Sequence, residues 1–178
     1  SAFPLTTSNF GTAVGYYAAA KMKYSFDVTA MGYAAMRSCD SCNFSTAIGY
    51  SSLANSYRST GMTALGWASA ANVRYGDVGT FIGYSAGRYA KSSLEDVVVG
   101  YEAMEGGSGA LDTMIAQGNT ISGYRSGRAA QNYLRNTLYG WRSADGLTDG
   151  QWNTVIGANA AGTTALFDRC VVIGANVP

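Results

Sequence analysis

The sequence predicts an all-β fold, a parallel β-helix or β-roll solenoid of about ten 17-residue coils. A five-residue unit, seen as Thr46–Tyr50, returns at a fixed interval along the whole chain. Each return has a glycine at the same place, and successive glycines are 17 residues apart except at one step of 23. These repeat-defining glycines are Gly15, Gly32, Gly49, Gly66, Gly83, Gly100, Gly123, Gly140, Gly157 and Gly174.

The repeated unit has the pattern of a strand that is covered on both sides. Counting from the threonine as position 0, position 2 is mostly apolar, position 4 is aromatic in eight coils, and position 1 is apolar throughout. Because alternate residues of a strand point to opposite faces, both faces are apolar, as in buried parallel sheets. One face must line the interior of the coil, and we infer that the other packs against a neighbouring chain.

Like positions of successive coils would form columns along the solenoid, and two further columns indicate tight stacking. The glycine at position 3 permits a bend or a close approach of two backbones. Position 6 is never larger than serine, which marks a corner or an axis with little space. Positions 8 to 16 are more polar and predict a turn, a weaker return strand and a second turn, with no helix of importance.

The one irregular step sets the boundaries along the chain. Residues 1–11 are interpreted as the end of a preceding coil, 12–104 as coils, 105–119 as an insertion loop, and 120–178 as further coils toward the tip of a longer fibre. The insertion adds six residues to one coil and contains Leu111, Met114 and Ile115. Insertions in solenoids lie on one face, which is often the binding face.

Charged residues support the stacking of like positions. Position 8 reads Arg88, Glu105, Arg128 and Asp145 in successive coils, with alternating sign. Position 5 places Glu102 one coil before Arg125. Opposite charges that face each other across neighbouring strands favour this register by about 0.2–1 kcal/mol per pair.

Composition excludes several functional classes. The net charge of +1 gives no reason to expect nucleic acid, and there is no apolar run long enough for membrane insertion. No signal peptide is visible. The spacing of Cys39, Cys42 and Cys170 is not a disulfide framework. Cys39-x-x-Cys42 could be a redox or metal half-site, but without histidine or a second pair a zinc site is not expected. We therefore expect free thiols in a reducing compartment, and no cofactor.

The chain also offers little for catalysis. The absence of histidine excludes the usual acyl-transfer triads. Gly106–Gly109 lacks the lysine and the context of a phosphate-binding loop. Acidic pairs exist at Glu95/Asp96, Glu102/Glu105 and Asp145/Asp149, but stacking would make Glu102 the ion-pair partner of Arg125. We expect no enzymatic activity.

The repeated pattern Asn/Ser-Thr-Ala-Ile-Gly-Tyr-x-Ala resembles the coil repeats of bacteriophage tail fibres and tailspikes. The matches are clearest at Ser45–Ser52, Gly79–Ala86 and Asn153–Ala160, and Val171–Pro178 looks like the segment before the chaperone-linked tip of such fibres. The repeat is also similar to that in the heads of trimeric autotransporter adhesins. Two departures are Ala158 and Ala175, which replace the aromatic residue of the last two coils.

The resemblance implies an elongated homotrimer in the virion, a tail fibre assembled in the host cytoplasm together with other fibre or tail proteins. It implies adhesion to the host cell surface through a glycan or another outer-surface receptor. The alternatives are a tailspike that depolymerises polysaccharide and the head of a bacterial trimeric adhesin. A fourth hypothesis, an ice-binding solenoid, is prompted by the threonine column, but its neighbours are apolar.

The candidate binding residues belong to the insertion and to the coils that flank it. Saccharides are commonly held by aromatic faces together with polar groups. The irregular step and the aromatic residues outside the repeated columns therefore suggest Tyr89, Asp112, Met114, Gln117, Arg128 and Tyr133. The competing interpretation is that the tyrosines pack between coils.

Overall fold

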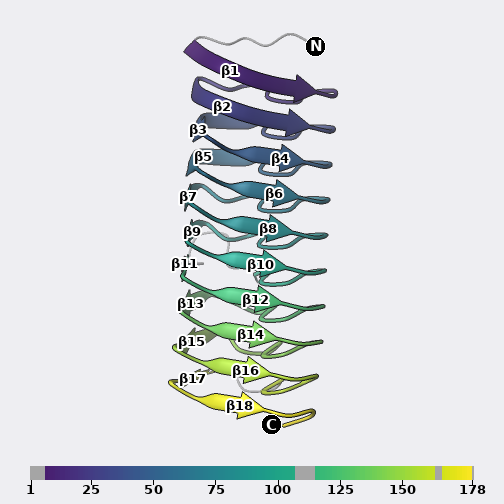
Figure 1. The fold of residues 1–178 in the computed structure, drawn as a ribbon, viewed down its shortest axis with the longest axis vertical. Helices are drawn as coiled ribbons and strands as arrows, with labels where there is room; N and C mark the ends of the chain where they lie inside the picture. The colour runs from purple at the N-terminus through teal and green to yellow at the C-terminus, as the bar shows by residue number, and fades with distance from the viewer. Residues whose placement is uncertain (1–6, 107–114, 163–165, 178) are drawn as a thin grey trace.

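In a computed structural model, which describes residues 7–106, 115–162 and 166–177, the chain is a parallel β-solenoid of about nine turns (Figure 1). The predicted fold class is confirmed, and the described residues contain no helix. The strands are β1 (Thr7–Val14), β2 (Tyr24–Met31), β3 (Ser38–Asn43), β4 (Thr46–Ile48), β5 (Asn55–Thr60), β6 (Thr63–Leu65), β7 (Tyr75–Asp77), β8 (Thr80–Ile82), β9 (Ser92–Leu94), β10 (Val97–Val99), β11 (Ile115–Gln117), β12 (Thr120–Ser122), β13 (Asn132–Leu134), β14 (Thr137–Tyr139), β15 (Asp149–Gln151), β16 (Thr154–Ile156), β17 (Leu166–Asp168) and β18 (Val171–Ile173).

Two parallel sheets form the walls of the solenoid. Sheet A contains ten strands in the order β1-β2-β4-β6-β8-β10-β12-β14-β16-β18, one from each repeated unit. Sheet B contains the eight return strands from β3 to β17. Figure 1 shows the strands of sheet A stacked from the N-terminal end to the C-terminal end, with those of sheet B behind them. The predicted return strand is thus confirmed in the eight coils that contribute a strand to sheet B.

The register keeps like positions in columns. Thr46 pairs with Thr63 and Ile48 with Leu65, which is the 17-residue step. Across the irregular coil, Val97 pairs with Thr120, a step of 23. Ile115–Gln117, which we had placed in the insertion, forms β11 in register with β9 and β13. The extra length therefore falls in 107–114, outside the described residues.

The core lies between two inward-facing columns. Position 1 supplies the interior side of sheet A, from Ala30, Ala47 and Ala64 to larger residues such as Phe81 and Ile121, all fully buried. Position 13 supplies the interior side of sheet B. The column at position 6 is buried within the single chain, which confirms the predicted tight packing and favours a corner over an axis between chains.

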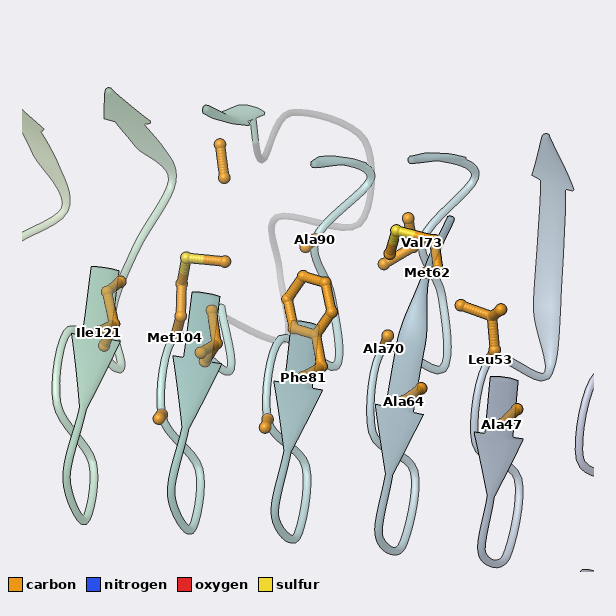
Figure 2. Packing of buried hydrophobic residues seen from close by; sticks show 14 of the residues in the cluster. Ala47, Leu53, Met62, Ala64, Ala70, Val73, Phe81, Ala90, Met104 and Ile121 are labelled. Carbon is orange, nitrogen blue, oxygen red and sulfur yellow. The ribbon is translucent and has the colours of Figure 1, made fainter. Parts of the chain in front are cut away.

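The size of the core residues is matched from coil to coil. Phe81 points into the interior toward Ala90 (Figure 2). Its ring fits because Gly79 and Gly87 have no side chain, and a β-carbon at either position would collide with the ring. Met62 and Val73 fill the interior beside Gly76 in the same way. Protein interiors are closely packed, so a large side chain in the core requires a small residue at the position that it contacts.

A ladder of buried polar side chains, one carboxylate and three amides, runs along the corner between the two sheets at position 16. Asp96, Asn119, Asn136 and Asn153 follow one another there, each at most 1 % exposed. Each asparagine donates its side-chain N–H both to the preceding Oδ1 and to a carbonyl of sheet B. Each Oδ1 also accepts the next backbone N–H in the column. We call these four residues the buried polar ladder.

The structure joins Cys39 and Cys42 by a disulfide within β3, where we had expected free thiols. Both residues are fully buried. The Cys-x-x-Cys spacing allowed a redox pair, but a spacing of three places the two residues on opposite faces of a regular strand, so free thiols were the prediction. Cys170 is a free, partly exposed thiol.

Candidate functional site

The outer face of sheet A carries two rows of side chains, mostly threonine at position 0 and mostly large apolar residues at position 2. Position 2 exposes a large aliphatic side chain in most coils, with Met31 40 % exposed, Leu65 42 % and Ile173 67 %. Monomeric proteins rarely expose contiguous apolar patches larger than a few hundred Å², and such patches mark interaction surfaces. Because position 1 fills the interior, this face is the one that we inferred to need a partner.

A continuous aromatic ladder borders this apolar column. It consists of the position-4 residues Tyr16, Tyr33, Tyr50, Trp67, Tyr84, Tyr101, Tyr124 and Trp141, each between 36 and 59 % exposed. Successive rings are stacked, with centroids 4.6–6.0 Å apart. Offset stacking at this spacing holds the rings in one orientation, so the ladder is a rigid surface before any partner binds.

Arginine side chains flank the aromatic ladder and are tied down by acidic residues. The guanidinium carbons of Arg125 and Arg142 lie 5.1 and 5.3 Å from the adjacent Tyr124 and Trp141 rings. Arg125 bonds to Glu102 at 2.7 Å, as the position-5 column predicted. Arg128 and Arg142 both bond to the carboxylate of Asp145. Within position 8, Arg88 and Glu105 are 3.9 Å apart.

The four predicted binding residues that lie in the described part of the chain have separate surroundings. Tyr89 and Arg128 lie in the turn segments, where Arg88 stacks on Tyr89 at 4.9 Å and Arg128 pairs with Asp145. Gln117 belongs to β11 in sheet B. Tyr133 is fully buried and donates its hydroxyl to the carbonyl of Leu147 at 2.7 Å. Burial also raises the pKa of Tyr133 well above its ordinary value. Asp112 and Met114 lie outside the described residues.

The acidic pairs considered for catalysis serve other contacts. The carboxylate of Glu102 is bonded to Arg125. Partial burial raises the pKa of Glu105, and the charge of Glu102 adds to this, while Arg88, Arg128 and Arg125 oppose it. Asp96 belongs to the buried polar ladder, and Asp145 is bonded to two arginines.

A groove lies on the outer face of sheet B near its C-terminal end. Its volume is about 650 Å³, and it is open to solvent. Six side chains from positions 12 and 14 line it in two rows, namely Ile115, Asn132 and Asp149, and Leu134, Gln151 and Asp168. Sequence reasoning missed this site because positions 12 and 14 vary from coil to coil. The available signal was that positions 12 and 14 lie on either side of position 13 in the return strand, so that a buried position 13 directs both of their side chains outward.

Asp96 is a buried carboxylate at the N-terminal end of the polar ladder. Burial raises its pKa, although hydrogen bonds from Ser93 and Asn119 to the carboxylate oppose the shift. The folded chain therefore binds this proton more tightly than the unfolded chain. Its contribution to stability is greatest below the ordinary carboxyl pKa of about 3.9 and is lost as pH rises through the raised pKa.

We expect Asp96→Asn to stabilise the chain at neutral pH, by an amount of the order of 1 kcal/mol. The amide still accepts from Asn119, and the Ser93 hydroxyl can accept as well as donate. The advantage over the natural chain should be larger at about pH 8 than at about pH 4, as measured by thermal denaturation. The exposed Asp77, changed to Asn, is the control. An advantage that stayed constant with pH would contradict this account of Asp96.

The described residues contain no cluster of three or more potential metal ligands of the histidine, cysteine or carboxylate type. In the same part of the chain, no helix has the length and apolar character needed to cross a bilayer.

Comparisons with models of known protein families, with curated proteins and with solved structures find no match for this chain. The 17-residue parallel solenoid is consistent with a β-helical repeat of the fibre type.

Proposed function

We propose that this chain is a structural and receptor-binding segment of a bacteriophage tail fibre, which assembles as a homotrimer and adheres to the host surface without catalysis. One observation supports the assembly more than any other. The apolar column and the aromatic ladder, beside the threonine row, form a regular surface that extends along the solenoid and is open to solvent in a single copy.

A second copy of this chain is the partner that best fits sheet A. The surface repeats with the period of the solenoid, so it matches another surface with the same period along its whole length. Burial of a large aliphatic side chain contributes about 1.5–3 kcal/mol, and ten coils provide many of them. The choice of three copies rests on the resemblance to phage fibres and trimeric adhesin heads. Sheet B then faces outward and remains available to a receptor.

The assembly is tested by light scattering on the purified chain. We expect a mass three times the 18.6 kDa of one chain. Replacing Leu65 and Val99 on sheet A with glutamate should abolish the trimer at micromolar concentration, because each carboxylate would be buried without a partner. Glutamate at Tyr75, which is 49 % exposed on sheet B, is the matched control and should leave the mass unchanged. A folded monomer, or a stable dimer, would contradict the proposal.

Adhesion is tested separately, by sedimenting the labelled trimer with a panel of bacterial strains. The proposed function requires retention by at least one strain, and it predicts no release of reducing ends from the purified surface polysaccharide of that strain. Release of reducing ends would instead support the depolymerase alternative.

A further inference from the structure

The groove on sheet B has the shape of a binding site for a chain-like ligand. Its two walls are parallel rows of side chains, and Gly150 and the partly buried Phe167 line it between them at position 13. The volume of about 650 Å³ lies within the range of about 300–1,000 Å³ typical of small-ligand sites.

The polar residues of the groove are held in place by bonds along the columns. Asn132 donates its side-chain N–H to Oδ1 of Asp149 at 2.5 Å. Asp168 accepts the backbone N–H of Gln151 at 2.8 Å. Because each carboxylate oxygen has two lone pairs, both groups keep the capacity to accept hydrogen bonds from a ligand. Paired carboxylate and amide groups suit vicinal hydroxyls, which donate and accept at neighbouring atoms.

An exposed tryptophan stands beside these groups. Trp152 directly follows Gln151, is 50 % exposed, and donates its backbone N–H to Leu134. The guanidinium of Arg135 lies 4.6 Å from its ring centroid and holds the ring in place. The guanidinium covers one face of the ring, and half of the Trp152 surface remains exposed next to Gln151 in the chain. An apolar ring face beside fixed polar groups matches a pyranose, which has one C–H-rich face and a rim of hydroxyls.

We propose that this groove, with Trp152 at its edge, binds a saccharide that carries no negative charge. The proposal rests on the adhesive function proposed above and gives its ligand a place on the molecule. Asp149 and Asp168 line the groove itself, so a uronate or sialate would meet like charge there. Neutral hexoses and amino sugars meet no such repulsion. Among the described strands that flank the groove, a peptide could pair only with β17, an edge strand of sheet B, because β11, β13 and β15 are already paired on both sides.

The test uses the purified chain on an array of bacterial surface oligosaccharides, followed by calorimetry with neutral, amino-sugar and uronate oligomers. We expect binding to neutral or amino-sugar oligomers, with at least tenfold weaker affinity for uronates. Trp152→Ala and Gln151→Ala should each weaken binding about tenfold or more. Phe44→Ala is the matched control, because Phe44 is exposed at the same coil position as Trp152, on a coil far from the groove. It should leave the affinity unchanged.

Three results would overturn the proposal: no saccharide bound, preferential binding of uronates, or equal loss of affinity in Phe44→Ala. Circular dichroism confirms that each variant is folded. Cell adhesion separates this inference from the proposed function. If the groove variants adhere to bacteria as the natural chain does, the groove is not the receptor site, although adhesion stands. If the natural chain binds saccharides through the groove but adheres to no strain, the groove stands and the fibre function fails.

Discussion

Replacing Gly66 with alanine is expected to destabilise the chain by about 3 kcal/mol or more. Gly66 has a φ of +131°, which residues with a side chain rarely adopt. A β-carbon there would lie 2.5 Å from the carbonyl oxygen of Gly83 in the next coil, and 2.8 Å from its carbonyl carbon. Both atoms belong to the backbone, so relief requires two stacked coils to separate.

The measurement is the free energy of unfolding from urea denaturation, with the oligomer mass recorded in parallel. Gly162→Ala is the control, because its φ lies outside the left-handed region and a β-carbon would be 3.4 Å from its nearest neighbour, the Asn159 oxygen. We expect that control to change stability by less than about 1 kcal/mol. If Gly66→Ala were as stable as the natural chain, the close stacking of the glycine column would be wrong.

The fold was predictable because its signal is repeated ten times. A period of 17, one glycine per unit and a column of small residues at position 6 are each unmistakable when they recur. Which face of the strand points into the coil was not predicted, because positions 1 and 2 are both apolar. A usable signal was present at Phe81, whose ring requires the neighbouring Gly79 and Gly87. A larger side chain in the interior column requires smaller residues at the positions that it contacts, whereas a side chain on the outer face has no such requirement.

The candidate site was harder to predict, for two physical reasons. The sequence left Tyr133 open as a binding residue or as a residue packed between coils. The structure bears out the packing, because its hydroxyl donates to the Leu147 carbonyl inside the coil. The groove residues Asn132, Gln151 and Asp168 come from coils whose positions 12 and 14 differ. Only the stacking of coils brings them together, and no single repeat contains the site.

Removing the side-chain amide of Asn136 should cost about 3–5 kcal/mol, because Asn136 makes bonds to both neighbouring coils. Its Oδ1 accepts the backbone and side-chain N–H groups of Asn153, both at 3.0 Å. Its Nδ2 donates to Oδ1 of Asn119 and to the carbonyl of Gly150. Each of these groups is buried, and an unsatisfied buried donor or acceptor costs about 1–3 kcal/mol.

Two substitutions separate the lost bonds from the lost volume. Asn136→Ala removes both, whereas Asn136→Leu keeps most of the volume, so a comparable loss of unfolding free energy in the two variants shows that hydrogen bonding dominates. Asn55→Ala is the control, since Asn55 bonds to Arg37 and Asn72 on an exposed surface and should cost less than about 1 kcal/mol. If Asn136→Leu were neutral, the ladder would be only a space-filling column, and the register of the coils would depend on the glycines and the apolar core alone.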